Sequence, residues 1–318
     1  METLLESPVA SKTSAQFAED LTVRSYYRPS PRENYWGRSS KPTRWCYSRT
    51  EQDIILNLAA TVSRDSLQVE VMRRDDSWDT DGGSIVRRYE LSNGTAGYFK
   101  PLQSNSRSEA DFRDYGMSSL AATISELNSY RMAQLLGGEY AELVPTTALR
   151  RIEGEVGTLQ LEVRESSSRR PSETELMGDH RRAALFDFII GNLDRHTSNF
   201  LYGLDARGYR RIKLIDNSFS FPSSRGGYLL NQSVFGDNIR GVAPGGTVHE
   251  IPWGDLELRD DEITLIRLAR SGVEGWLSAK TIGIERGRAT LRRIDYLLDE
   301  GKLGVFSTYF EGVSNCDY

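Results

Sequence analysis

Apolar and polar residues alternate along the first half of the chain in the way that strands require. The runs SIVRRYEL and TAGYFKPL, at 84–91 and 95–102, meet at Asn93-Gly94, which is a strong signal for a two-residue hairpin turn. Two further runs of this kind, VPTTALRR and GTLQLEV, follow at 144–151 and 157–163. These patterns predict a small antiparallel sheet.

Helical spacing of apolar residues marks three other parts of the chain. The segment from Leu120 to Leu135 predicts one helix, which ends at Gly137-Gly138. A polar loop, ESSSRRPSETE, then leads into a long buried helix through LFDFIIG. Beyond the strand-like runs NFLYG and RRIKLID, which flank Gly208, helical spacing returns at 260–300 and ends at Gly301.

This order of elements predicts an α+β fold with two lobes. A β-rich lobe with one helix, residues 51–164, is followed by a mainly helical lobe, residues 165–318. Residues 1–50 are expected to form an extension, because Ser, Pro and Arg are frequent there and no apolar period persists. A chain of 318 residues with 38% apolar residues can fill the core of such a protein.

Cysteine and histidine are scarce. Two cysteines, at 46 and 316, cannot make a disulfide framework, and three histidines show no zinc-ligand spacing. No apolar run approaches the roughly 18 residues of a membrane span, and the start METLLESPVASK lacks the basic and apolar stretches of a signal peptide. We therefore expect a soluble, cytoplasmic protein.

Charge is distributed unevenly along the chain. Between Arg24 and Arg49 seven Arg or Lys residues face one acid, so this stretch carries +6 while the remainder carries −11. One interpretation is an arm that binds nucleic acid or an acidic substrate. The other, which the composition favours, is an arm folded over the acidic surface of the same protein.

Several polar residues have the types and positions that phosphoryl transfer from ATP requires. The reaction needs a cation on the phosphates, oxygen ligands for Mg²⁺ and a carboxylate near the incoming hydroxyl. Lys100 lies in the second strand of the predicted hairpin, and Glu126 lies 26 residues later in the middle of the next helix. Kinases form an ion pair between a strand lysine and a helix glutamate in this order.

The segment DRHTSN and the strand after it supply the oxygen atoms. Asp194 precedes Asn199 by five positions, the separation of the base and the metal-binding asparagine in the kinase catalytic loop. Asp216 follows the apolar run IKLI, where a second metal ligand is expected. Each residue alone has an ordinary structural explanation, but together, in kinase order, they favour a catalytic site.

These motifs also carry a family resemblance, over residues 80 to 300. FDFIIGNLDRHTSNFL with KLIDNSFSF resembles the Asp-Arg-His-x-x-Asn and Ile-Asp motifs of phosphatidylinositol 3-/4-kinases, and is similar to HipA-like and secretory-pathway kinases. Tyr98 to Pro101 and Val144 to Thr147 match Tyr-x-Lys-Pro and Val-Pro-x-Thr of small bacterial phosphatidylinositol 3-/4-kinase-like proteins. The resemblance implies a two-lobed atypical kinase fold that uses ATP and Mg²⁺.

The resemblance also implies a role for each matching residue. Lys100 would hold the α- and β-phosphates and Glu126 would fix Lys100. Asn199 and Asp216 would bind Mg²⁺, and Asp194 would orient or deprotonate the acceptor hydroxyl.

Three further assignments are less direct. The strand from Leu159 to Val163, with Leu161 and Val163 as contacts, would be the hinge that touches adenine. Arg195 and His196 match the motif too, and we expect His196 to make a structural hydrogen bond rather than to take part in the chemistry.

The sequence departs from the kinase pattern in two places. Gly82, Gly83 and Ser84 stand in place of G-x-G-x-x-G, and we expect their backbone amides to cradle phosphate. After Asp216 the chain has Asn-Ser where lipid kinases and conventional protein kinases have Phe-Gly. Regulation by a flipping phenylalanine is therefore not supported.

The acceptor is less clear from the sequence than the reaction. Between Asp216 and Glu250 only Arg225 and Arg240 are basic, which argues against an anionic phosphoinositide membrane as substrate. A protein Ser/Thr or a small-molecule hydroxyl is favoured, with residues 231–246 lining its site. Alternatives that stay open are AMP transfer, a non-catalytic nucleotide-binding scaffold, and nucleic-acid binding through residues 24–49.

Overall fold

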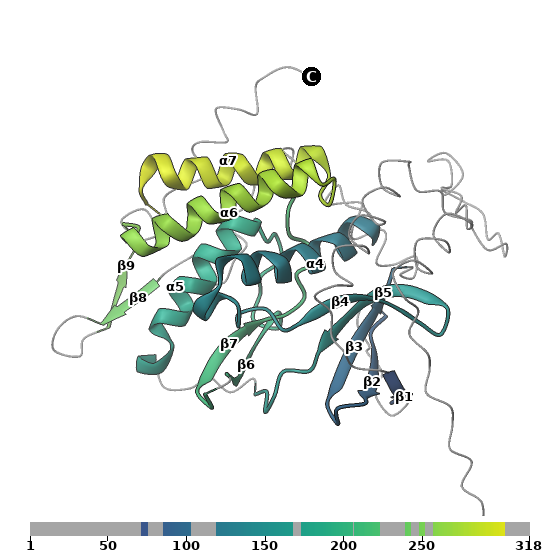
Figure 1. Ribbon diagram of the computed structural model, residues 1–318. Helices are drawn as coiled ribbons and strands as arrows, with labels where there is room; N and C mark the ends of the chain where they lie inside the picture. Colours follow the sequence, from purple (N-terminus) through teal and green to yellow (C-terminus); the bar gives the residue numbers. More distant parts are fainter. Residues whose placement is uncertain are drawn as a thin grey trace, which may run out of the picture.

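The computed structural model describes residues 71–75, 85–102, 119–167, 173–205, 207–222, 239–242, 248–251 and 257–302. It has a sheet-rich part and a helix-rich part (Figure 1), which confirms the predicted two-lobed α+β fold. The predictions for the extension at 1–50 with its basic arm, for Gly82, Gly83 and Ser84, and for most of 231–246 lie outside the described residues.

The first lobe contains one antiparallel sheet of five strands, in the order β1-β2-β3-β5-β4. The strands are β1 (Val71–Arg74), β2 (Arg87–Leu91), β3 (Ala96–Pro101), β4 (Thr147–Ile152) and β5 (Glu155–Leu161). Since β3 lies in the middle of this order, a side chain on β3 is held between two neighbouring strands. The predicted small antiparallel sheet is thereby confirmed.

The hairpin between β2 and β3 differs from the predicted two-residue turn. Leu91 N donates to Thr95 O at 2.9 Å, so three residues, 92–94, form the loop. A two-residue turn of the Asn-Gly type needs a positive φ at both positions, and here only Gly94 has one, at 77°. Asn93 instead accepts hydrogen bonds from the backbone and hydroxyl of Thr95, at 3.1 and 2.7 Å.

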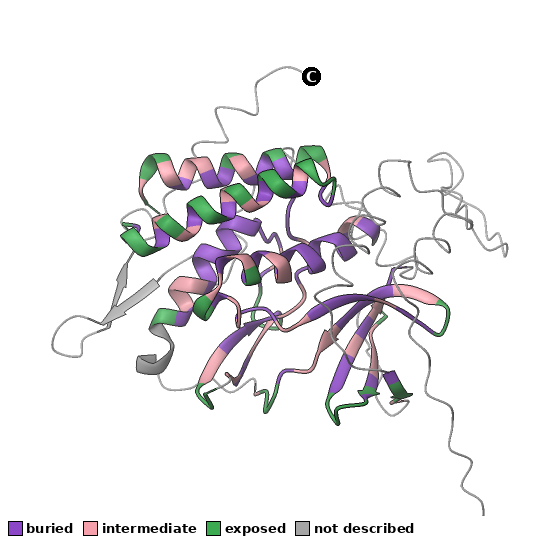
Figure 2. Cartoon of the chain, in the orientation of Figure 1, coloured by how far each residue is buried: buried purple, intermediate pink, exposed green. Residues whose placement is uncertain are grey.

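Helix α4 (Ser119–Leu136) lies between the sheet and the helices of the second lobe (Figure 1). Leu120, Ile124 and Leu127 are buried, as the predicted apolar face requires. The helix is also buried on most of its other sides (Figure 2), including Glu126 and Asn128. Its end at Gly137 and Gly138, with φ of 68° and 52°, leads into the short 3-10 helix η1 (Gly138–Tyr140).

The second lobe is built around a large apolar core. Its elements are α5 (Glu173–Ile190), β6 (Phe200–Leu204), β7 (Arg210–Leu214), β8 (Ile239–Val242), β9 (Val248–Ile251), α6 (Asp260–Ser278) and α7 (Ile284–Glu300). Phe186, Ile212, Ile266 and Ile294 are completely buried in this core, to which Met132 of α4 also belongs. Within the described part of the chain, none of the helices combines the length and apolar character of a membrane span.

The packing of β5 against β3 gives a first testable prediction. A Cβ atom at Gly157 would lie 2.1 Å from the carbonyl oxygen of Lys100, a backbone atom that cannot rotate away. We expect Gly157→Ala to lower the free energy of unfolding by about 1–3 kcal/mol, the usual cost of overpacking. Gly275, in α6, has no such neighbour within 4 Å, so Gly275→Ala should raise it by about 1 kcal/mol.

Urea unfolding of the two variants and the wild-type chain measures both effects. Equal stability of Gly157→Ala and wild type would contradict the close approach of β3 and β5.

Candidate active site

Lys100 of β3 joins three separate parts of the chain. Its Nζ lies 2.6 Å from Oε1 of Glu126 on α4 and 2.9 Å from Oδ1 of Asp216, two residues after β7. The ion pair that the strand and helix positions predict is therefore present, and Asp216 shares it. This arrangement of sheet lysine, helix glutamate and strand-end aspartate is that of a kinase-like fold.

The charges of this cluster support one another. Burial opposes the charge on Lys100, but the nearby carboxylates of Asp216 and Glu126 outweigh it and hold the pKa of Lys100 above its ordinary value. Burial likewise disfavours ionised Asp216, yet Lys100 and the hydroxyl of Ser218 together keep the pKa of Asp216 below its ordinary value. Both groups are therefore charged at neutral pH.

The carboxylate of Glu126 also makes hydrogen bonds to residues other than Lys100. Its Oε2 accepts a hydrogen bond from the backbone N of Asn217 at 3.1 Å, and Ser218 Oγ lies 3.0 Å from its Oε1. The neighbouring Ser125 donates to Ser220 O at 2.6 Å. These contacts fix α4 to the segment after β7, and sequence reasoning missed them because nothing in the pattern pairs residues more than ninety positions apart.

Asp194 and Asn199 are held at the two ends of one short loop. The Nδ2 of Asn199 donates to Asp194 O at 2.7 Å, and Asp194 N donates to Oδ1 of Asn192 at 2.8 Å. Burial raises the pKa of Asp194, and the negative charge of Asp216 adds to this effect. Ile215 N donates to Asn199 O at 3.1 Å, so the end of this loop lies next to the residue that precedes Asp216.

Arg195 connects this loop to the strand that follows it. The side chain is completely buried. It donates to Asp187 of α5 at 3.0–3.2 Å, to the carbonyl oxygens of Asn199 and Ile215 at 2.5 and 2.7 Å, and to Oδ1 of Asn217 at 2.5 Å. All three of its nitrogen atoms thus donate hydrogen bonds, and the residue fixes the backbone at Asn199 and beside Asp216.

His196 lies at the surface of the same loop. Its side chain is 54% exposed, and Nδ1 accepts a hydrogen bond from Ser198 N at 3.2 Å. The structural hydrogen bond expected of this residue is present. Its Nε2 is 3.8 Å from Oδ2 of Asp194, too far for a hydrogen bond in this state.

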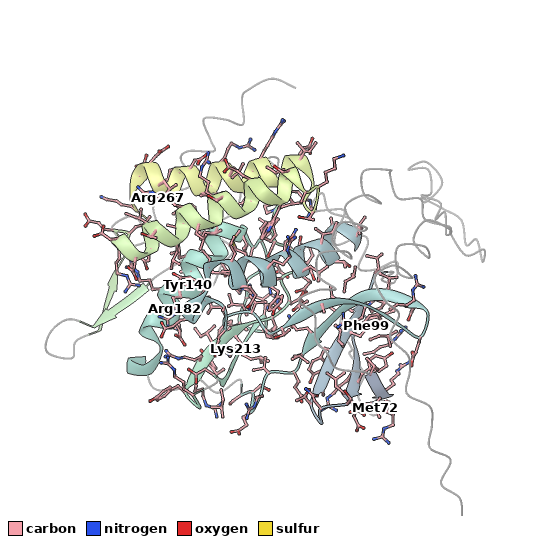
Figure 3. All side chains as sticks on the ribbon, viewed as in Figure 1. Met72, Phe99, Tyr140, Arg182, Lys213 and Arg267 are labelled. Carbon is pink, nitrogen blue, oxygen red and sulfur yellow. The ribbon has the colours of Figure 1, made fainter. Side chains whose placement is uncertain are left out.

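The side chains of Leu161 and Val163 do not face Lys100, and their predicted contact with adenine stays a prediction. Leu161 packs against an apolar cluster that includes Phe99, on the opposite face of the sheet; Figure 3 marks Phe99. Val163 lies against Gly203 of β6. Because side chains alternate along a strand and Lys100 pairs with Thr158, the polar Thr158, Gln160 and Glu162 share the face of Lys100.

The residues at the end of β7 fit a divalent metal ion. Asp216 has a φ of 51°, in the left-handed region, and its side chain is 42% exposed. Within the described residues no hydrogen bond is made to its Oδ2 or to Oδ1 of Asn199. Mg²⁺ binds such oxygens and keeps several waters. Among the described residues, no cluster of three or more His, Cys, Asp or Glu side chains that could hold a metal ion occurs.

The buried position of Arg195 gives a second prediction. Lysine at this site keeps the charge but cannot reach all of these acceptors, so Arg195→Lys should lower the free energy of unfolding by about 1–3 kcal/mol, the cost of leaving buried acceptors without a hydrogen bond. Arg270 of α6 pairs with Asp295 and Glu274 at the surface, where such pairs contribute about 0–1 kcal/mol. Arg270→Lys is therefore the matched control.

Urea unfolding of the two lysine variants tests the difference. A loss below 1 kcal/mol in Arg195→Lys would mean that this arginine does not anchor the loop.

Comparison with known proteins finds similarity only among solved structures. No protein-family model matches the chain, and no curated protein matches its sequence. The Helicobacter pylori proinflammatory kinase CtkA is 12% identical, with a TM-score of 0.39, and the match covers 77% of this chain and 97% of that one. The Golgi casein kinase is 11% identical, with a TM-score of 0.45, covering 85% of this chain and 78% of that one.

The Golgi casein kinase with Mn/ADP bound is also 11% identical, with a TM-score of 0.46 and coverage of 95% and 84%. Because these identities and TM-scores are low, the function of the chain is inferred from its own residues.

Proposed function

We propose that the chain is an ATP- and Mg²⁺-dependent phosphotransferase of the atypical, phosphatidylinositol 3-/4-kinase-like type. The observation that supports this most directly is the cluster of Lys100, Glu126 and Asp216, with contacts of 2.6 and 2.9 Å. A lysine on a sheet strand, a buried helix glutamate and a carboxylate at a strand end are the parts that phosphoryl transfer uses. The loop from Asp194 to Asn199 supplies the remaining groups.

Each residue has a distinct task in this reaction. Lys100 turns to the phosphates of ATP and neutralises part of their charge, while Glu126 keeps its ammonium group in place. Asn199 and Asp216 would hold Mg²⁺, which when bound neutralises the charge of the β- and γ-phosphates. Asp194 orients the acceptor hydroxyl.

Transfer of the γ-phosphoryl group needs only ATP and the acceptor hydroxyl as reactants. The acceptor oxygen forms a bond to the γ-phosphorus as the bond between this phosphorus and the β,γ-bridging oxygen breaks, and ADP leaves. The hydroxyl proton passes to the carboxylate of Asp194.

The proposed acceptor is a protein Ser/Thr or a small molecule with a hydroxyl group. A phosphoinositide is disfavoured because only two basic residues, Arg225 and Arg240, occur between Asp216 and Glu250. Nucleic acid remains a candidate partner only for residues 24–49.

Labelled ATP tests the proposal and separates its alternatives. The wild-type chain is incubated with Mg²⁺, candidate proteins and small hydroxyl compounds, using ATP labelled in either the γ- or the α-phosphate, and products are identified by mass spectrometry. Transfer of the γ-label to an acceptor is expected. Transfer of the α-label would indicate an AMP transferase instead, and nucleotide binding without transfer to any acceptor would indicate a scaffold.

A further inference from the structure

Ser218 lies between the two carboxylates of the site. Its Oγ is 3.0 Å from Oε1 of Glu126 and 2.9 Å from Oδ1 of Asp216, and the residue is 7% exposed. The Nζ of Lys100 contacts the same two oxygen atoms. A lysine and a serine therefore bridge one pair of oxygens, one from α4 and one from the end of β7.

These two bridges differ in the number of protons they hold. The ammonium group of Lys100 has three protons and can donate to both carboxylates at once. The hydroxyl of Ser218 has one proton and can donate to only one of them at a time. As long as Lys100 holds both carboxylates, Ser218 adds a second donor to only one of them.

Nucleotide binding would change this balance. In the proposed reaction Lys100 turns toward the phosphates and releases Asp216. Glu126 would still accept from Asn217 N and is almost completely buried, so its orientation does not depend on Ser218. Within the described residues Asp216 has no hydrogen-bond donor besides Lys100 and Ser218, and its side chain is 42% exposed.

We propose that Ser218 is a positioning residue for Asp216. By donating its proton to Oδ1 of Asp216 it keeps Oδ2 turned to the metal after Lys100 has moved to the phosphates. This inference rests on the proposed function. It also gives a purpose to the Asn-Ser sequence that follows Asp216, since glycine, which stands at the position of Ser218 in lipid kinases and conventional protein kinases, has no hydroxyl to donate.

Isothermal titration calorimetry of ADP, with and without Mg²⁺, tests this role directly. We expect Ser218→Ala to bind ADP without metal as the wild-type chain does, within about twofold, because Lys100 and Glu126 are unchanged. The gain in ADP affinity on adding Mg²⁺ should fall by roughly tenfold, as a lost hydrogen bond to a charged group implies. Ser218→Thr, which restores the hydroxyl, should recover most of this gain.

The ratio of affinities with and without Mg²⁺ is compared within each variant, after its thermal unfolding without ligand has shown that it is folded. Ser218→Gly removes the hydroxyl with no added volume and serves as the second variant. An unchanged Mg²⁺-dependent gain in both hydroxyl-free variants would overturn the role of Ser218. An equal loss with and without Mg²⁺ would overturn it as well, because a purely structural tie to α4 affects both.

A different result bears on the enzyme itself. If the wild-type chain showed no Mg²⁺-dependent binding of ADP, the proposed function would be contradicted, whatever the variants did.

Discussion

Replacing Asp216 with alanine is expected to abolish Mg²⁺-dependent nucleotide binding and, with it, turnover. Asp216 is the carboxylate of the proposed metal pair, and its Oδ2 is left without a hydrogen bond from the described residues. A metal ion contributes several kcal/mol to a transition state of this charge, so the loss in rate should be on the order of 10³-fold or more. Titration calorimetry with ADP and Mg²⁺ measures the binding part.

The fold should survive this change. Lys100 keeps its contact with Glu126 at 2.6 Å, and the Asp216 side chain is 42% exposed, so no large cavity forms. Asp295 of α7 is the matched control, because its side chain is 43% exposed and pairs with Arg270. Asp295→Ala should leave binding and turnover as in the wild-type chain, and a variant Asp216→Ala that still bound ADP with Mg²⁺ would remove Asp216 from the metal site.

The core of this site could be predicted because it depends on local patterns. Alternation placed Lys100 in a strand, helical spacing placed Glu126 in the following helix, and the motif fixed the separation of Asp194 and Asn199. The contact between Lys100 and Glu126 then followed from the kinase order of the elements. The two-lobed arrangement was predictable for the same reason, since apolar residues mainly alternate in the first lobe and mainly follow helical spacing in the second.

Features that depend on register or on distant polar contacts could not be predicted. Which side chains of β5 face Lys100 is decided by the pairing of Lys100 with Thr158, and a shift by one residue would turn Leu161 to that face. The contacts from the Ser125 and Glu126 side chains to residues 217–220 reach two backbone groups and one hydroxyl more than ninety positions away. No periodic pattern marks such pairs.

Arg293 illustrates the same limit in the second lobe. It is 1% exposed and donates to the carbonyl oxygens of Ile189 and Ile190 at 3.3 Å, and to Thr290 Oγ1 at 2.9 Å. Burial lowers the pKa of Arg293 to about 9. A positive side chain at the carboxyl end of α5 donates hydrogen bonds to the last carbonyl groups of the helix and interacts favourably with the helix dipole. Glycine is required at 191 for this packing, because a Cβ atom there would lie 2.7 Å from Cζ of Arg293.

The last expected result concerns Asp194, whose replacement by asparagine should separate chemistry from binding. Asparagine has the same shape, and the loop is held by the backbone of Asp194, whose N donates to Asn192 and whose O accepts from Asn199. Nucleotide binding should therefore stay within a few-fold of the wild-type value. The amide cannot take the proton of the acceptor hydroxyl, so turnover should fall by roughly 10²- to 10⁴-fold.

Two measurements on the same variant, turnover of the identified acceptor and ADP affinity with Mg²⁺, distinguish this result from that of Asp216→Ala. Asn199→Ala is the intermediate case, because it removes an amide ligand, a weaker one than a carboxylate, and should raise the Mg²⁺ requirement without abolishing binding. The assignment of Asp194 as the base, and of Asp216 and Asn199 as metal ligands, depends on this difference between the variants. Loss of ADP binding in Asp194→Asn, combined with normal binding and turnover in Asp216→Ala, would reverse the roles assigned to the two carboxylates.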